Sequence, residues 1–348
     1  MQILINGRFL DGPISGVERY ALGLSALILK NRPEAFFIVP ERSGRTPTKR
    51  TIRSGVGHGH FWEQTTLARE SRKSDLLISP ANTGPLMGGR QIVVIHDMSF
   101  WHHPEWYDKG FARTIKELIP RLVKQAEHII TLSEYSKTDM CRTLFIPPQK
   151  VTVVPPFTEF TGEHDVPNGL DRPYFLVVGS TDPRKNLRNA IEAFKRIASR
   201  EVDLVIVGRR ISSLHDAMAN EDNPRIKFLD DVQDEQLEGL YKGATALLNT
   251  STFAGFGFPI LEAMACETPV ICSDIPVFRE VFGDAPYYID PMNVDQIANA
   301  LDRVAMHRDV ARFHARKGSQ VAAHYTPDRS WRVFSKVLES QLSKDRVQ

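Results

Sequence analysis

The segment from Ala244 to Cys272 most constrains what this chain can fold into. Its ends, Ala246 to Leu248 and Val270 to Cys272, are short apolar runs bounded by turn residues, which is typical of buried parallel strands. Between them, good helix formers at 260–265 follow Pro259, and proline suits the first position of a helix. The segment therefore predicts a strand, a helix that begins at Pro259, and a second parallel strand.

The loop before this helix predicts a ligand site. Gly255 and Gly257 remove two side chains where the backbone would meet a ligand, and the unpaired N–H groups of a helix start favour an anion. Glu262 is expected in the first turn, where the helix dipole favours a negative side chain that can reach back over the loop. A carboxylate beside an anion site indicates a ligand that also carries hydroxyl groups, as a ribose does.

Length and the order of patterns predict two domains. The chain has 348 residues, 42% of them hydrophobic, and is longer than a domain of ordinary size with a single hydrophobic core. Strand and helix patterns alternate on both sides of a polar segment, 158–172, which we interpret as the linker. The predicted fold is α/β, with two doubly wound, Rossmann-like parallel-sheet domains at residues 1–160 and 173–325 that face each other across a cleft.

The alternation assigns strands and helices on both sides of that linker. Helices are expected from Val17, at about 111–125 with a kink at Pro120, from Ser133 and Leu187, near Leu214 and from Asp234. The remaining predicted strands are 2–5, 91–95, 128–131, 151–154, 174–178, 204–207 and 226–229.

Charge and cysteine content exclude some classes of protein. Lysine plus arginine number 44 against 42 for aspartate plus glutamate, so the overall charge does not favour a nucleic-acid partner. Cys141, Cys266 and Cys272 are an odd number without CxxC spacing, which fits a reduced, cytoplasmic setting. The N-terminus begins with a strand pattern rather than an apolar leader, and no apolar run reaches the length of a membrane span.

One basic cluster stands out within residues 41–60. Lys49, Arg50 and Arg53 lie among small and turn-forming residues, and could hold the protein against anionic lipid at the inner face of a membrane or bind a pyrophosphate-linked acceptor. The alternative is a solvated, mobile loop, which is favoured because the segment lacks the stripe of an interfacial helix.

Two further positions in the first half are candidates by their place. Gly16 opens a predicted helix that Ser15 would cap, and it indicates either close approach of a phosphate or sugar, or only a tight turn. His96 and Asp97 follow the strand that ends at Ile95, where ligands collect in open α/β sheets. The alternative for His96 is a structural histidine bonded to Asp97 or to backbone.

A second anion signal lies at residues 179–186, GSTDPRKN. Arg184 and Lys185 stand beside a helix start, with Asn186 as a possible cap, so cations and backbone donors would meet a diphosphate there. The strand before Gly179 and the strand before the Gly255 loop should end at the same sheet edge, which would bring both signals to one volume.

Several motifs together are similar to glycosyltransferase family 4, the retaining enzymes of the GT-B architecture. The matching stretches, in order along nearly the whole chain, are SGVERY, HDMSFWHHPEWY, HIITLSEYSK, VVGSTDPRKN and GFGFPILEAMACETPVICSDIPVFRE. The resemblance implies transfer of a sugar from a nucleotide diphosphate donor with retention, no cofactor and no divalent metal. It also implies that a last helix at 326–343 packs back on the first domain.

The resemblance carries functional roles to specific residues. Arg184 and Lys185 would bind the donor diphosphate, Glu262 the ribose hydroxyls, and His96 the donor sugar or its leaving phosphate. The backbone near Val232 would meet the base, and Gly16 would lie against the phosphates. The implied catalytic residues are His96, Arg184 and Lys185, and the implied donor-binding residues are Gly16, Gly179, Val232, Ala254, Gly255, Phe256, Gly257 and Glu262.

The sequence departs from the family at Ala254. The family motif has a glutamate there, eight residues before Glu262, which contacts the donor sugar. Its replacement leaves three explanations: a different sugar such as a deoxy sugar, substitution by Asp182 or Thr252, or binding without turnover. The PRKN turn resembles that of mannosyltransferases, so GDP-mannose is the expected donor and a glycan or lipid-linked oligosaccharide in polysaccharide assembly the expected acceptor. A sugar-nucleotide epimerase or phosphorylase of the same architecture is the alternative enzyme.

Overall fold

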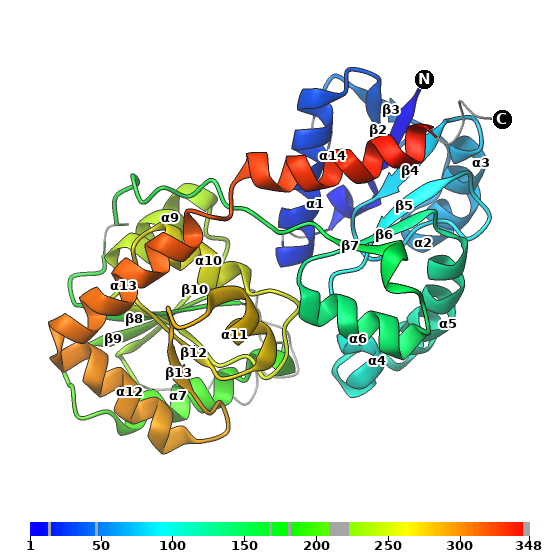
Figure 1. The fold of residues 1–348 in the computed structure, drawn as a ribbon. Coiled ribbons are helices and arrows are strands. Elements are labelled where there is room, and N and C mark those ends of the chain that lie inside the picture. Colours follow the sequence, from blue (N-terminus) through cyan, green and yellow to red (C-terminus); the bar gives the residue numbers. More distant parts are fainter. Residues whose placement is uncertain (13–14, 46–47, 167–168, 180–181, 209–222, 344–348) are drawn as a thin grey trace. The chain divides into compact units, whose positions relative to one another are not determined.

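The computed structural model describes residues 1–12, 15–45, 48–166, 169–179, 182–208 and 223–343. The chain forms two compact units (Figure 1). Unit 1 comprises Met1–Phe157 and Thr326–Gln348, and unit 2 comprises Thr158–Tyr325. Each unit is built on a parallel sheet with helices connecting its strands, so the predicted doubly wound fold is confirmed. The helix expected near Leu214 lies outside the described residues.

Unit 1 has a seven-stranded sheet in the order β3-β2-β1-β4-β5-β6-β7. The strand order reverses between β1 and β4, so this pair marks the switch point at which ligands collect in such sheets. The strands are β1 (Ile3–Asn6), β2 (Ala35–Val39), β3 (Thr51–Arg53), β4 (Leu76–Ser79), β5 (Gln91–Val94), β6 (His128–Thr131) and β7 (Val151–Val153).

Helices cover both faces of this sheet (Figure 1). Apolar side chains of α2, the π-helix η2 and α5 pack on one face, and α1 lies against α14 over the other. Pro120 lies inside α5, which continues past it. The helical segments are η1 (Arg8–Asp11), α1 (Gly16–Asn31), α2 (Gly59–Trp62), η2 (Glu63–Leu67), α3 (Ala68–Ser71), α4 (Ser99–His102), η3 (Pro104–Trp106), α5 (Lys109–Gln125), α6 (Glu134–Leu144), η4 (Pro148–Lys150) and α14 (Pro327–Ser343).

The C-terminal helix α14 belongs to unit 1. Phe334 and Leu338 are fully buried, as expected for an amphipathic helix that covers a sheet. Polar contacts add to this packing, because the Arg32 guanidinium bonds to Glu339 at 3.1 Å and the Ser330 hydroxyl donates to the Pro155 carbonyl at 2.6 Å.

Unit 2 has a six-stranded sheet in the order β10-β9-β8-β11-β12-β13. Here the order reverses between β8 and β11, which are direct neighbours through the pairs Ala246–Phe175 and Leu247–Leu176. The strands are β8 (Tyr174–Val178), β9 (Asp203–Val207), β10 (Ile226–Leu229), β11 (Ala246–Asn249), β12 (Val270–Ser273) and β13 (Tyr287–Ile289).

The sheet of unit 2 is covered on one face by α7 and α12, whose buried side chains form a core with the strands. On the other side α10 packs against α9 and α13 (Figure 1). The helical segments are η5 (Pro183–Lys185), α7 (Leu187–Arg196), α9 (Asp234–Gly243), α10 (Phe258–Ala265), α11 (Pro276–Phe282), α12 (Val294–Met306) and α13 (Arg308–Ala322).

The start of the segment predicted to be a linker is anchored to unit 2. The buried carboxylate of Glu238 on α9 accepts from the backbone N–H groups of Thr161, Gly162 and Glu163 at 2.8, 2.6 and 3.1 Å. His164 Nδ1 lies 3.0 Å from the other oxygen of the same carboxylate. Residues 161–164 therefore have a defined place on unit 2, although their composition is that of a loop.

Candidate functional site

Two of the predicted anion-binding loops meet at the switch point of unit 2. Gly179 and the turn η5 follow β8, and the glycine loop before α10 follows β11. Because β8 and β11 are adjacent and parallel, both loops lie at the same edge of the sheet.

Hydrogen bonds join these two loops directly. The Thr252 N–H donates to the Arg184 carbonyl at 2.8 Å. The Thr250 hydroxyl is 3.0 Å from the Lys185 carbonyl and 3.1 Å from the Asn186 carbonyl. The loop after β11 thus holds the backbone of the basic turn on which Arg184 and Lys185 stand.

The lysine of this turn lies over Gly179. A Cβ added at Gly179 would come within 3.3 to 3.5 Å of the Lys185 side-chain carbons. Gly179 also has φ +149°, a conformation that L side chains rarely adopt. Both observations explain why glycine precedes the basic turn.

Arg184 and Asn186 differ from the simplest expectation for a helix start. The Arg184 Nε lies 2.9 Å from a carboxylate oxygen of Asp182, so the cation is held by a neighbour within its own turn. Asn186 occupies the position before α7 with φ 51°, but its amide does not cap the helix. It donates instead to the Pro291 carbonyl at 2.7 Å.

The glycine loop is shaped by packing as well as by any ligand. Gly257 has φ +114°, and a Cβ there would approach the Phe278 ring to 2.9 Å and the Phe282 ring to 3.1 Å. Phe256, predicted to bind the donor, is only 2% exposed and packs 5.4 Å from the Tyr325 ring. The ring of Phe256 is therefore part of the apolar packing behind the loop.

The position of Glu262 differs from the prediction. The helix α10 begins at Phe258 rather than Pro259, and its first turn contains no acidic residue. Glu262 lies one turn further in and is only 2% exposed. Its Oε2 accepts from the Tyr241 hydroxyl at 2.8 Å. Tyr241 gave no signal in the sequence, since an apolar-facing tyrosine of an amphipathic helix normally serves only the core.

The other predicted positions of unit 2 lie around this edge. Ala254 and Gly255 stand in the loop between β11 and α10, the first half-buried and the second buried. Val232 is half-buried in the connection from β10 to α9. Thr252 and Asp182, the two residues considered as substitutes for the family glutamate, both contact Arg184.

The candidates of unit 1 flank its own switch point. His96 follows β5 and is 5% exposed. Its Nε2 lies 3.3 Å from the Pro80 carbonyl, and the backbone N–H of His96 donates to the Asn82 side-chain oxygen at 2.9 Å. Tyr20 stands edge-on to the imidazole, with 5.3 Å between ring centroids. The His96 imidazole thus lies beside the Pro80 carbonyl, and its role toward a donor stays a prediction.

Gly16 is the exposed first residue of α1. Ser15 caps this helix as predicted, since its hydroxyl accepts from the Val17 N–H at 3.2 Å and Glu18 reaches back to the Ser15 N–H. The reciprocal bonds fix the place at which the backbone enters the helix.

Arg50 and Arg53 of the basic segment both bond to backbone carbonyls. Arg50 donates to the carbonyl of Arg32 at 3.0 Å, at the C-terminal end of α1. Arg53 donates to the carbonyls of Glu41 and Ser43 at 3.0 and 2.8 Å. Two of the three cations considered for membrane contact therefore hold backbone carbonyls.

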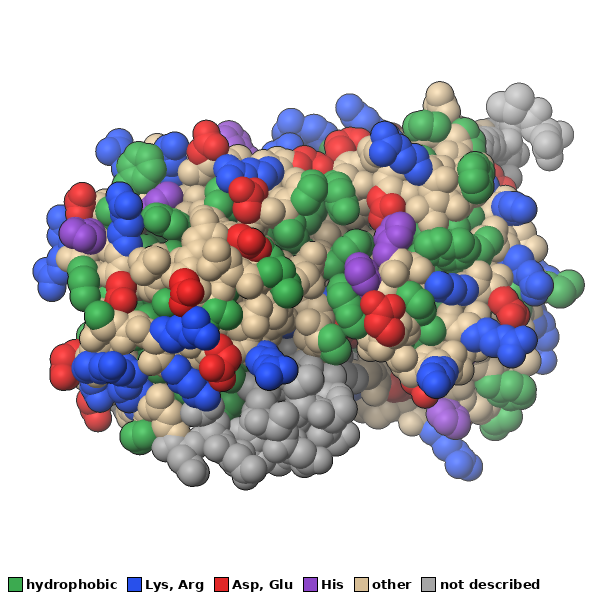
Figure 2. Space-filling model, turned by 90° about the horizontal axis from the view of Figure 1, so that it is seen from below, with side chains coloured by type: hydrophobic (Ala, Val, Ile, Leu, Met, Phe, Trp, Pro, Cys, Tyr) green, Lys and Arg blue, Asp and Glu red, His purple; other side chains and the backbone are tan. Residues whose placement is uncertain are grey.

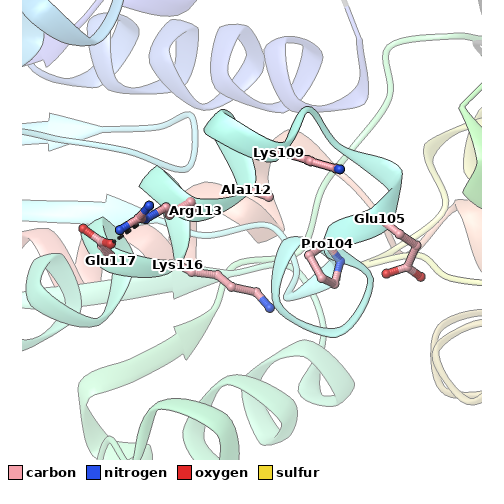
Figure 3. A pocket seen from close by; sticks show the side chains of 7 residues that line it. All are labelled: Pro104, Glu105, Lys109, Ala112, Arg113, Lys116 and Glu117. Carbon is pink, nitrogen blue, oxygen red and sulfur yellow. Dashed lines mark hydrogen bonds and ion pairs between the residues drawn. The ribbon is translucent and has the colours of Figure 1, made fainter.

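A surface pocket of unit 1 lies on helical segments that follow β5, not at the β1–β4 switch point of its sheet (Figure 3). It is formed by η3 and α5, and Arg113 pairs with Glu117 on its lining at 3.4 Å. Its lining residues are Pro104, Glu105, Lys109, Ala112, Arg113, Lys116 and Glu117. None of the predicted site residues lines this pocket.

Neither the surface charge nor the buried cysteines indicate a further functional site. Basic and acidic side chains are interspersed on the face seen in Figure 2. Burial raises the pKa of the Cys266 thiol to about 12 and that of Cys272 well above its usual value, so neither is a ready nucleophile.

The described part of the chain lacks both a cluster of metal ligands and a membrane-spanning helix. No group of three or more histidine, cysteine, aspartate or glutamate side chains there is placed to hold a metal ion. Among the same residues, no helix combines the length and apolar character that crossing a membrane requires.

Comparison with known proteins agrees with the geometry. Residues 162–317 match the family described as Glycosyl transferases group 1, and residues 14–160 match Glycosyltransferase Family 4. The O-antigen chain mannosyltransferase RfbU of Salmonella typhimurium is 29% identical over 269 residues, which cover 73% of each protein.

Solved structures share the whole fold. Sucrose-phosphate synthase from Thermosynechococcus elongatus has a TM-score of 0.80 at 16% identity, over 99% of this chain and 100% of that one. Anabaena HepE, solved with UDP and glucose, has a TM-score of 0.78 at 17% identity, over 98% of this chain and 100% of that one. The GT-B architecture implied by the resemblance is thereby confirmed, and the chain belongs to glycosyltransferase family 4 and is a glycosyltransferase.

Proposed function

We propose that this enzyme transfers mannose from GDP-mannose, with retention of configuration, to a glycan or lipid-linked oligosaccharide in polysaccharide assembly. The main support for the donor site comes from hydrogen bonds. They join the turn that contains Arg184 and Lys185 to the loop after β11. These bonds keep two cations beside the entrance of α10, where backbone N–H groups and the helix dipole also favour a diphosphate.

In unit 2, we propose that different residues bind different parts of the donor. Lys185 and Arg184 bind the diphosphate, and Asp182 orients the guanidinium through its contact at 2.9 Å. Glu262 accepts from the ribose hydroxyls, and the backbone near Val232 meets the base. In unit 1, His96 contacts the donor sugar or its leaving phosphate, and Gly16 lies against the phosphates.

The chemistry then depends on stabilising the leaving group. The bond between the anomeric carbon and the phosphate oxygen breaks, and a bond to the acceptor oxygen forms on the same face. The acceptor hydroxyl loses its proton to the departing phosphate. Prearranged cations and N–H donors stabilise the charge that develops on the diphosphate, so this scheme needs neither a metal ion nor another cofactor.

The mannosyl donor is supported by RfbU, which is named as an O-antigen chain mannosyltransferase. HepE was solved with UDP and glucose, so a uridine donor is the direct competitor. The test is binding of GDP, UDP and ADP by calorimetry, followed by a transfer assay with the matching sugar donors. Tightest binding of GDP and transfer of mannose are expected, whereas preference for UDP would reject the guanosine donor.

Ala254 makes turnover a necessary part of this test. A protein that only binds nucleotide sugars would bind GDP without transferring sugar to any acceptor of a panel. An epimerase would convert the donor alone into an isomeric sugar nucleotide. Transfer with release of GDP, and an unchanged donor when acceptor is omitted, are the results that we expect.

We also propose that the protein contacts anionic lipid at the inner face of a membrane. Arg50 and Arg53 already donate to backbone carbonyls, so contact with anionic lipid would depend most on Lys49, with about 1 kcal/mol per cation near the surface. Sedimentation with vesicles that contain anionic lipid, compared between the wild type and Lys49→Ala, tests this contact.

A further inference from the structure

We infer that Tyr241 is a positioning residue for the donor site, because it holds the carboxylate of Glu262 in the orientation that ribose recognition needs. This inference rests on the proposed role of Glu262. The Tyr241 hydroxyl donates to Glu262 Oε2 at 2.8 Å across the contact between α9 and α10. The tyrosine is fully buried and the glutamate is 2% exposed.

Because both side chains are buried, this hydrogen bond contributes strongly to the stability and orientation of the Glu262 carboxylate. A carboxylate removed from water must regain hydrogen bonds from the protein, and a bond to a charged group is stronger than one between neutral groups. A donor on one oxygen also fixes the plane of the carboxylate. In this arrangement Oε2 is the oxygen held by Tyr241, and Oε1 is the oxygen that accepts from the ribose hydroxyls.

Tyr241 is itself held from two further sides. The Thr268 hydroxyl, which follows α10, donates to the Tyr241 carbonyl at 2.6 Å. The Phe160 ring lies 6.1 Å from the Tyr241 ring. A tyrosine fixed at its backbone, ring and hydroxyl presents its O–H in one place, which is what a supporting residue of a binding site must do.

The experiment compares a nucleotide with and without its ribose hydroxyls. Binding of GDP and of 2′,3′-dideoxyguanosine diphosphate is measured by calorimetry for the wild type, Tyr241→Phe and Glu262→Gln, with the matching uridine pair if UDP binds more tightly. The wild type is expected to bind GDP about 10-fold or more tightly than the dideoxy analogue. In Tyr241→Phe this ratio should fall to about 3-fold or less, as the carboxylate loses its fixed orientation.

Tyr174→Phe is the matched control. Tyr174 is a buried tyrosine of the same unit whose hydroxyl donates to the Leu240 carbonyl at 2.8 Å, so Tyr174→Phe removes a buried tyrosine bond to α9 without removing a bond to Glu262. The GDP to dideoxy ratio should remain at the wild-type value. Thr268→Val, which removes the bond to the Tyr241 carbonyl, is a second probe if Tyr241→Phe does not fold, and should also lower the ratio.

Three outcomes separate the possibilities. If Tyr241→Phe, or Thr268→Val in its place, weakens both nucleotides equally and keeps the ratio, Tyr241 only supports the fold and the inference is wrong. If the wild type does not distinguish the two nucleotides, the ribose role of Glu262 is wrong and the inference fails with it. A ratio that falls in Tyr241→Phe and in Glu262→Gln, but no further in the double variant, supports the inference.

Discussion

At the scale of single residues, the basic turn carries the clearest expectation. Lys185→Ala and Arg184→Ala each remove a cation from the leaving-group site, and we expect kcat to fall about 100-fold in each, the usual cost of losing one prearranged donor. Steady-state kinetics with the best donor provide the measurement.

Lys195→Ala is the matched control for these two variants. Lys195 stands on α7 in the same unit and pairs with Glu192 at 3.2 Å, away from the β8–β11 edge. Its removal should leave kcat unchanged. Wild-type rates in both Lys185→Ala and Arg184→Ala would discard the proposed diphosphate site.

Gly179 supports a prediction about backbone shape. Gly179→Ala places a side chain at φ +149° and against the Lys185 side chain at 3.3 Å, so we expect a loss of about 1–3 kcal/mol in stability and weaker nucleotide binding because Lys185 is displaced. Thermal unfolding and calorimetry measure the two effects.

Gly44→Ala serves as the comparison for Gly179→Ala. A Cβ at Gly44 meets nothing within 4 Å, so stability and affinity should stay close to the wild type. Equal behaviour of the two variants would mean that the backbone at Gly179 is not restricted as described.

At the scale of elements, the contact of Glu238 with residues 161–164 makes stability depend on pH. Burial raises the pKa of this carboxyl, but bonds from the Thr161 and Gly162 N–H groups and from His164 outweigh it and lower the pKa below 4.5. A lowered pKa means that the charged form is favoured by folding, so the stabilisation is complete above pH 4.5 and is lost as the pH falls through the lower folded-state value.

Glu238→Gln should therefore destabilise the protein by about 1–3 kcal/mol at pH 7, and the difference from the wild type should narrow as the pH falls below 4.5. Far-UV circular dichroism during thermal unfolding gives the values. Glu235→Gln, an exposed position in the first turn of the same helix, should cost no more than the ~0.3–1 kcal/mol of its interaction with the helix dipole. A difference that stays constant with pH would contradict the proposed role of the Glu238 charge.

At the scale of the whole molecule, tryptophan fluorescence reports on the unfolding of unit 1 and not of unit 2. Trp62, Trp101, Trp106 and Trp331 all belong to unit 1. GDP at a hundredfold its dissociation constant should add about 2.7 kcal/mol to the stability of the part that binds it. We expect hydrogen exchange to slow in η5 and α10 of unit 2, with a smaller change in the tryptophan fluorescence transition. Protection confined to unit 1 would contradict a donor site at the β8–β11 edge.

The sequence predicted much of this organisation from local patterns. Runs such as Tyr174–Val178 and Ile226–Leu229 became strands with the predicted bounds, because buried parallel strands are recognisable as continuous apolar stretches. Four strands were not predicted: Ala35–Val39, Thr51–Arg53, Leu76–Ser79 and Tyr287–Ile289. Thr51–Arg53 carries no apolar pattern, and it becomes a strand only by pairing with β2.

For the site, the sequence by itself determined which chemical groups are present: two cations in the turn after one strand, glycines before a helix after another, and a carboxylate in that helix. These follow from residue type and spacing along the chain. Only the tertiary structure decided that Glu262 lies a turn deeper and bonds to Tyr241, that Asn186 turns to Pro291, and that Glu238 anchors residues 161–164. Hydrogen bonds between residues tens of positions apart depend on how helices and strands pack, and no local pattern encodes that packing.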